Sequence, residues 1–144
     1  LIGPPEAIAC AIDLATNTTY GVPGYIQDAA LFAMEAAGLE SEVAAPFLRR
    51  RDIVQKVLST QSIVRSVPPQ GAMYVMLDIR ETGLSGEAFA NALLDTHRIA
   101  VMPGESFGAS AAGHVRVAMT VADDRFEDAL YTICQFAAGL PQAA

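Results

Sequence analysis

Residue types that carry common enzyme chemistry are scarce in this chain of 144 residues. It has one lysine, Lys56, two histidines, two cysteines and no tryptophan. The cysteines, Cys10 and Cys134, lie in apolar helical contexts and have neither CxxC spacing nor a matching pair of histidines, so no metal site is predicted. We interpret both cysteines as buried, reduced thiols.

The two histidines are not placed for a nucleophilic triad, which needs a serine or cysteine, a histidine base and an orienting acid. His97 ends a predicted helix and His114 starts a predicted strand, and neither accompanies the turn that presents a nucleophilic serine. The glycines within 104–108 match neither the dinucleotide-binding pattern nor the P-loop pattern, and we interpret them as turn residues. The sequence therefore favours neither a hydrolase nor a phosphate-binding loop.

An excess of basic charge is also missing, since the net charge is −7. Nucleic-acid binding depends on clustered lysine and arginine, so we expect no nucleic-acid partner. The one basic cluster, residues 49–51, is interpreted as a solvated helix face. No apolar run approaches the ~20 residues of a membrane span, and residues 1–5 have neither an initiator Met nor the features of a secretory signal. We expect no membrane partner, a cytoplasmic location and a chain that is part of a longer protein.

Hydrophobic residues make up 52% of the chain and charged residues 17%, which is typical of a globular protein. Apolar residues of helical period occupy its first part. They predict helices from residue 5 to about 17, from 25 to 37, closed by Gly38 as a left-handed cap, and from 41 to 58, with a break or kink at Pro46. The first two helices have no strand of their own to cover, so we expect them to dock on something outside this chain.

After residue 71 the apolar pattern changes to a period of two, which is typical of strands. The predicted elements are a strand over 72–79, a helix with Phe89, Ala92 and Leu93 on its inner face, a short strand over 99–102, a type II turn centred on Pro103 and Gly104, a strand over 114–120 and a helix from about 123. This order predicts a two-layer α/β unit.

Arg116 lies in the middle of the predicted strand over 114–120, on the face opposite Val115 and Val117. Long charged side chains are mostly exposed, so a solvent-facing strand arginine is one interpretation. If that face borders a cleft, the guanidinium offers two parallel donors that suit a carboxylate. The residues alone leave both interpretations open.

Three segments, in this order, resemble the class I/II (fold type I) aminotransferases. Residues 69–75, Pro-Gln-Gly-Ala-Met-Tyr-Val, resemble the family's P-x-G-A-F/M-Y strand. Residues 101–108 resemble its V-x-P-G-x-x-F-G strand and turn, and residues 113–118 resemble its G-x-I/V-R-I/L-S/A strand. Residues 2–6 and 27–30 resemble its G-P-P-E helix start and its Q-x-A-A helix, so the resemblance covers essentially the whole chain.

Within the family, the runs 78–85 and 109–114 are most similar to arginine–pyruvate transaminases. The resemblance implies that residues 41–144 form the C-terminal small domain on the substrate side, with a short mixed or antiparallel sheet and helices on one face. Residues 1–40 would then be the helical tail of the large pyridoxal-phosphate-binding domain. The family members are usually homodimers.

The resemblance also implies the reaction. Such enzymes move an amino group between an amino acid and a 2-oxo acid, such as pyruvate or 2-oxoglutarate, with pyridoxal phosphate as electron sink. The aligned arginine, Arg116, would hold the α-carboxylate of the substrate. The family's Schiff-base lysine, the residues that hold the pyridine ring and most phosphate ligands correspond to positions upstream of residue 1.

We therefore expect no catalytic and no cofactor-binding residue in this chain, and no transamination by the chain alone. Lys56 lies on the charged face of a predicted helix with Arg49 and Asp52, whereas a Schiff-base lysine needs a desolvated pocket that lowers its pKa.

Three alternatives stay open. A lyase or decarboxylase with the same fold would differ mainly around the cofactor. Some transcription regulators carry an aminotransferase-like effector domain, which a basic helix-turn-helix segment upstream would indicate. The chain could also act only as a dimerisation module.

Overall fold

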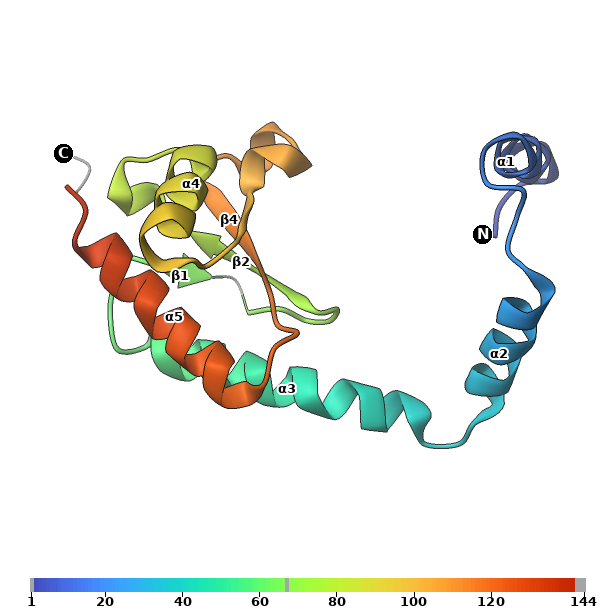
Figure 1. Cartoon of the computed structure of the whole chain (residues 1–144), viewed down its shortest axis with the longest axis horizontal. Helices are drawn as coiled ribbons and strands as arrows, with labels where there is room; N and C mark the ends of the chain where they lie inside the picture. Colours follow the sequence, from blue (N-terminus) through green and yellow to red (C-terminus); the bar gives the residue numbers. More distant parts are fainter. Residues whose placement is uncertain (1, 67, 142–144) are drawn as a thin grey trace. The chain divides into compact units, whose positions relative to one another are not determined.

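The computed structural model describes residues 2–66 and 68–141. The chain divides into two compact units, residues 1–41 and 42–144, and Figure 1 shows the elements of both.

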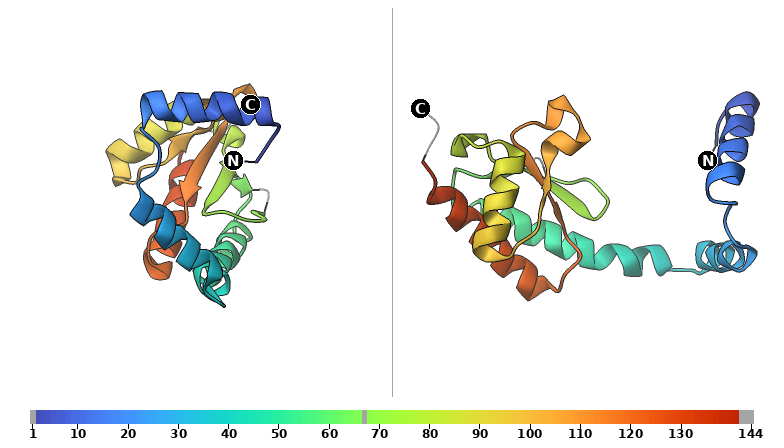
Figure 2. Two further views of the ribbon diagram at one scale, coloured as in Figure 1. Left: turned by 90° about the vertical axis from the view of Figure 1, so that its right-hand side faces the viewer. Right: turned by 45° about the horizontal axis from the view of Figure 1, so that its top comes forward.

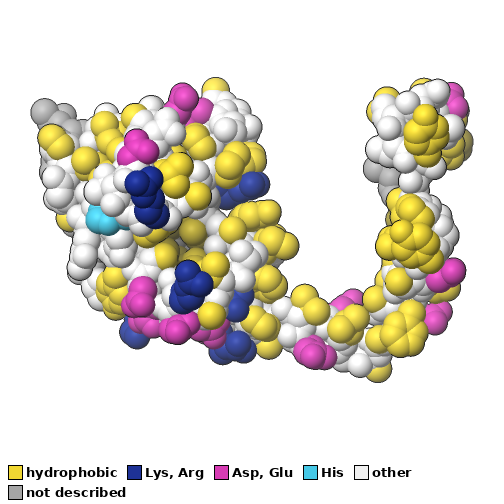
Figure 3. Space-filling model, in the orientation of Figure 1, with side chains coloured by type: hydrophobic (Ala, Val, Ile, Leu, Met, Phe, Trp, Pro, Cys, Tyr) yellow, Lys and Arg dark blue, Asp and Glu magenta, His cyan; other side chains and the backbone are white. Residues whose placement is uncertain are grey.

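The first unit consists mainly of α1 (Pro5–Thr18) and α2 (Gly24–Glu35). Pro5 begins α1, because a proline in the first turn lacks only an N–H that has no helical partner. Neither helix buries a residue, and Figure 3 shows hydrophobic side chains on the surface of both. The interpretation of Cys10 as a buried thiol is therefore wrong, since Cys10 is exposed on α1, whereas Cys134 is buried.

The predicted end of the second helix is also displaced. Gly38 adopts the left-handed conformation, with φ of +84°, but α2 ends at Glu35 because Ala36 is already extended, with ψ of 111°. The next helix, α3 (Leu39–Leu58), begins two residues earlier than predicted and is continuous through Pro46. The predicted break at Pro46 is therefore absent from the helix, although its ring removes one backbone N–H donor.

The second unit contains a four-stranded antiparallel sheet in the order β1-β2-β4-β3. Its strands are β1 (Arg65–Ser66), β2 (Tyr74–Asp78), β3 (Met102–Pro103) and β4 (His114–Ala118). The strand predicted over 114–120 ends earlier, at Ala118, and the strand predicted over 99–102 is displaced to Met102–Pro103, but their order is as predicted. Two of the strands, β2 and β4, form the centre of the sheet with five paired residues each.

One face of this sheet is covered by α3, α4 (Gly86–His97) and α5 (Asp123–Ala138). Figure 2 shows α4 and α5 on the same side of the central strands. The buried core lies between these helices and the inward side chains of the sheet; it comprises Val54, Val57, Val64, Val75, Leu77, Ile79, Phe89, Leu93, Val115, Val117, Met119, Phe126, Leu130, Ile133, Cys134 and Ala137. The predicted two-layer α/β fold with helices on one face of the sheet is thus confirmed.

Side-chain bonds connect α3 to the first turn of α5. Arg50 donates from Nε to Oδ1 of Asp123 at 2.7 Å and from Nη1 to the carbonyl oxygen of Met119 at 2.9 Å. Arg49 donates to the other carboxylate oxygen of Asp123 at 2.9 Å. The interpretation of residues 49–51 as a solvated face is wrong for Arg50, whose side chain is only 13% exposed.

Three short 3-10 helices complete the second unit: η1 (Arg80–Thr82), η2 (Gly104–Phe107) and η3 (Ala109–Ala111). The predicted type II turn is wrong, because it requires a positive φ at Gly104 and that residue instead begins η2. Gly104 is required for a different reason, since a Cβ there would clash with the carbonyl oxygen of Ala111.

Candidate functional site

Arg116 lies in the middle of the sheet, on the face opposite the one that α3, α4 and α5 cover. Its strand β4 pairs on both sides, so that Arg116 is opposite Met76 on β2 and Met102 on β3. Its neighbours in sequence, Val115 and Val117, are buried on the helix side. Arg116 itself is half-buried, and its predicted placement on the face opposite the two valines is confirmed.

Two aromatic rings lie against this guanidinium. Its Cζ lies 4.1 Å from the ring centroid of Tyr74 on β2 and 4.1 Å from that of Phe107 in η2. Such distances are within the range of a favourable cation–π interaction. In the described part of the chain, no carboxylate or other hydrogen-bonding group contacts the guanidinium of Arg116. Its N–H donors are therefore available to an anionic ligand.

A small pocket of about 160 Å³ opens beside Arg116. Besides Arg116, its lining consists of mostly apolar residues: Tyr74, Ala100, Val101, Met102 and Ala118. A single cation in a mostly apolar lining suits a ligand with one anionic group attached to a carbon skeleton. The pocket is smaller than the ~300–1,000 Å³ of a complete ligand site, so it can hold one end of a substrate.

The other arginines differ from Arg116. Five have carboxylate partners: Arg49 and Arg50 pair with Asp123, Arg51 with Asp52, Arg65 with Glu81, and Arg80 with Asp78. The remaining two, Arg98 and Arg125, are exposed. Among residues 2–66 and 68–141, Arg116 is thus the one half-buried arginine whose guanidinium lacks a counter-ion.

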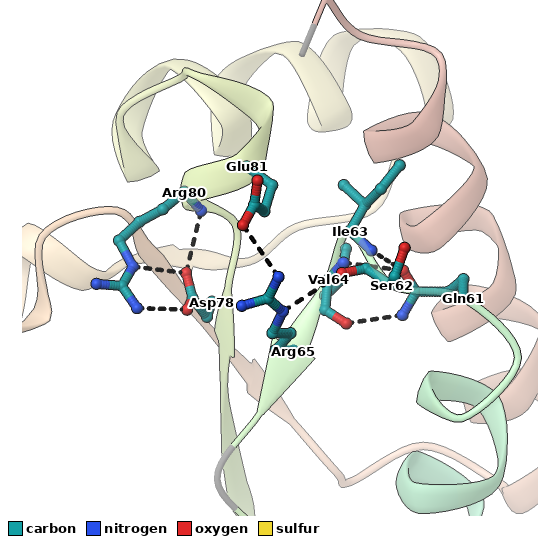
Figure 4. Close-up of polar contacts among 8 residues, drawn as sticks. All are labelled: Gln61, Ser62, Ile63, Val64, Arg65, Asp78, Arg80 and Glu81. Carbon is teal, nitrogen blue, oxygen red and sulfur yellow. Dashed lines mark hydrogen bonds and ion pairs between the residues drawn. The ribbon is translucent and has the colours of Figure 1, made fainter. Parts of the chain in front are cut away.

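A second polar region lies at the β1–β2 edge of the same face, and Figure 4 shows its contacts. Arg80 forms two parallel bonds to the carboxylate of Asp78, at 2.9 and 2.6 Å. These hydrogen bonds hold the pKa of Asp78 at about 2. Arg65 donates to Glu81 at 3.0 Å, so the charges of this region compensate one another.

The loop that carries Phe107 is fixed by Glu105. Its carboxylate accepts hydrogen bonds from the backbone N–H groups of Gly86 at 2.9 Å and Gly113 at 3.2 Å. The pKa of Glu105 is lowered by backbone hydrogen bonds, from its own N–H first and then from those two glycines. Glu105 thereby connects η2 to the beginning of α4 and to the residue before β4, and these contacts fix the backbone that presents Phe107.

Lys56 does not fit covalent attachment of an aldehyde cofactor. Its Nζ lies 2.7 Å from Oε1 of Glu127 on α5, and its side chain is 65% exposed. The hydrogen bond that Lys56 donates to Glu127 raises the pKa of Lys56, whereas a Schiff-base lysine needs a lowered pKa. In addition, no group of three or more metal-ligating side chains occurs in the ranges that the structure describes.

Over the described ranges, no helix combines the length and the apolar character needed to cross a bilayer.

Sequence reasoning identified Arg116 but missed Tyr74, Phe107 and Glu105 as its surroundings. A signal was present, because Tyr74 and Phe107 belong to the same two segments, 69–75 and 101–108, that carried the family resemblance. What the residues could not show was that both rings meet one guanidinium.

Comparisons with known proteins identify a family for the chain. The family model described as Aminotransferase class I and II matches residues 1–133. An arginine–pyruvate transaminase of Pseudomonas aeruginosa is 43% identical over 141 residues, which is 97% of this chain and 36% of that protein. An LL-diaminopimelate aminotransferase of a Nostoc species is 35% identical over 131 residues, or 90% of this chain and 33% of that protein. The chain therefore spans about a third of the length of these relatives.

Solved structures give the same result. An aromatic aminotransferase from Pyrococcus horikoshii matches with a TM-score of 0.76 and 28% identity, covering 88% of this chain and 34% of that one. A double mutant of Thermus thermophilus aspartate aminotransferase matches with a TM-score of 0.77 and 26% identity, covering 92% of this chain and 35% of that one.

Proposed function

Because the chain belongs to the family of class I and II aminotransferases, we propose that it is the substrate-side part of an enzyme that transfers an amino group between an amino acid and a 2-oxo acid. Residues 41–144 would form the small domain, and residues 1–40 the helical tail of the large cofactor-binding domain. The division of the chain near residue 41 supports this assignment.

Arg116 is proposed to bind the α-carboxylate of the substrate. The observation that carries the proposal is a half-buried guanidinium with no counter-ion in the described chain, at the mouth of an apolar pocket. A planar guanidinium offers two parallel N–H donors that match the two oxygens of a carboxylate. Both the amino acid and the 2-oxo acid carry this group, so one arginine serves both halves of the reaction.

The cofactor is proposed to be pyridoxal phosphate, which supplies an electron sink when bound. The environment of Lys56 does not fit its attachment. The residue that holds it is therefore proposed to belong to the parent protein outside this chain, and this chain alone is proposed to be inactive.

Arginine with pyruvate is the substrate pair to test first, since the relative that is 43% identical is named for that pair. A homodimeric parent is part of the proposal, supported by apolar side chains such as Phe32 and Leu14 that are exposed on the first unit. A cytoplasmic location is proposed because Cys10 and Cys134 are free thiols, as in a reducing compartment.

The test is steady-state kinetics of the full-length protein that contains this chain, with several amino acids and with pyruvate or 2-oxoglutarate. Arg116→Ala removes a charged group that makes two hydrogen bonds, so kcat/KM for the amino acid should fall about 100-fold or more. Arg98→Ala is the matched control, because Arg98 is exposed and also lacks an ion-pair partner in the described chain.

Unchanged kinetics of Arg116→Ala would remove Arg116 from the substrate site. If the protein binds pyridoxal phosphate but transfers no amino group, a lyase, a decarboxylase or a regulator's effector domain replaces the proposal.

A further inference from the structure

The guanidinium of Arg116 contacts two aromatic rings that come from different elements. Tyr74 lies on β2 and Phe107 in η2, and both centroids are 4.1 Å from Cζ of Arg116. Neither ring belongs to the core, since Tyr74 is 38% exposed and Phe107 is 45% exposed. Both rings lie outside the core cluster, so packing of the core does not account for their contact with Arg116.

We propose that Tyr74 and Phe107 are positioning residues that form an aromatic clamp around Arg116 and thereby set the affinity of the enzyme for the substrate carboxylate. The inference rests on the proposed function of Arg116. The clamp is defined as these two rings, and neither ring is proposed to touch the reacting atoms.

The shape of the guanidinium explains why a clamp is useful. The group is planar, and its N–H donors lie in that plane, along its edge. Rings over the faces restrict the rotation of the side chain and leave the edge free for a ligand. A carboxylate then meets donors that are already aligned, so less conformational entropy is lost when it binds.

Charge gives a second reason. An arginine can also be fixed by an aspartate or glutamate, as Asp78 fixes Arg80 in the same domain. Such a carboxylate would compete with the substrate for the same donors. The rings attract the cation through their faces and occupy none of its N–H groups, so they hold Arg116 without blocking it.

The backbone around the clamp is rigid in the way this role requires. Tyr74 is fixed because β2 pairs with β4, opposite Ala118 and two residues from the pairing of Met76 with Arg116. Phe107 is fixed because Glu105, which lies in the same short helix, accepts hydrogen bonds from the backbone N–H groups of Gly86 and Gly113 outside it. Both rings therefore reach Arg116 from well-ordered backbone on two sides.

The test measures KM and kcat for the amino acid in the full-length protein, with Phe107→Leu, Tyr74→Leu and Tyr74→Phe. Each leucine variant should raise KM about 3- to 30-fold, the range of a cation–π contact at a partly exposed site, with a smaller change in kcat. Tyr74→Phe keeps the ring and should stay within about twofold of the parent protein. Tyr131→Leu, a change of an exposed tyrosine on α5, is the control.

A double-mutant cycle decides whether the rings act through Arg116. If they do, Phe107→Leu should have no further effect on kcat/KM once Arg116 is alanine. An equal loss with and without Arg116 would overturn the clamp. Leucine variants with a normal KM for the amino acid would also overturn the clamp. If Arg116→Ala still impaired binding of the amino acid, the proposed function would stand. Normal kinetics of Arg116→Ala would instead remove the proposed function.

Discussion

Two phenylalanines of this chain should respond in opposite ways to the same substitution. Phe89 on α4 is fully buried and packs edge-to-face on Phe136, with the ring centroids 5.2 Å apart. Phe107 in η2 is 45% exposed and contacts Arg116. Because Phe89 is part of the core, we expect it to contribute to the stability of the fold. Because Phe107 is part of the proposed clamp, we expect it to contribute to the affinity for the substrate.

The magnitude for Phe89→Ala follows from its burial. Removing a buried phenylalanine costs about 3–5 kcal/mol, because the apolar contacts are lost and a cavity remains. The net stability of a domain is only about 5–15 kcal/mol, so a large part of it is lost. Phe107→Ala leaves no cavity in the core, and its effect on stability should stay within about 0.5–1 kcal/mol.

Urea unfolding followed by far-UV circular dichroism measures both variants against the parent protein. The urea concentration at the transition midpoint should fall strongly for Phe89→Ala and little for Phe107→Ala. The dependence of the free energy of unfolding on urea concentration should be similar in both variants. Equal destabilisation by the two substitutions would refute the reasoning, because it would show that Phe107 belongs to the core and that its loop is packed differently.

Three further predictions concern charge and close packing. Arg80 lowers the pKa of Asp78 to about 2. The stabilising contribution of Asp78 should therefore be fully present above its unfolded pKa of about 3.9 and be lost as the pH falls through about 2. The free energies of unfolding of Asp78→Asn and of the parent protein should accordingly differ at pH 7 and converge near pH 2. Lys56→Arg should leave transamination by the full-length protein unchanged, because arginine preserves the ion pair with Glu127, and loss of activity would return Lys56 to the active site. Gly104→Ala should destabilise the protein and raise KM for the amino acid, because the added Cβ would clash with the backbone of Ala111 and displace η2; normal unfolding and normal KM would contradict this placement of the loop.

Local pattern was sufficient for most elements of the second unit. The period-two spacing of Val75, Leu77 and Ile79 placed β2, and the helical stripe of Phe126, Leu130 and Ile133 placed α5. These signals are local, since a side chain's face depends on its position in the strand or helix period. Element ends were less certain because they depend on backbone angles, as the extended Ala36 shows for α2.

Local sequence pattern did not determine whether the sheet face that carries Arg116 borders a ligand. The alternation around Arg116 placed it opposite Val115 and Val117, but an arginine on an uncovered strand face is compatible with plain solvent exposure. The family resemblance implied that Arg116 holds the α-carboxylate of the substrate, because ordered motifs in three segments carry information that one strand lacks.

Only the tertiary structure brought the surroundings of Arg116 together. Tyr74 is far from Phe107 and Arg116 in the chain, and the contact of the three residues depends on the antiparallel pairing of β2 with β4 and on the anchoring of η2 by Glu105. The same holds for Arg50, which charge patterning assigned to solvent and which the packing of α3 against α5 places beside Asp123. The physical reason is common to both cases: local periodicity decides which face a side chain occupies, whereas its partners are decided by contacts between residues distant in the sequence.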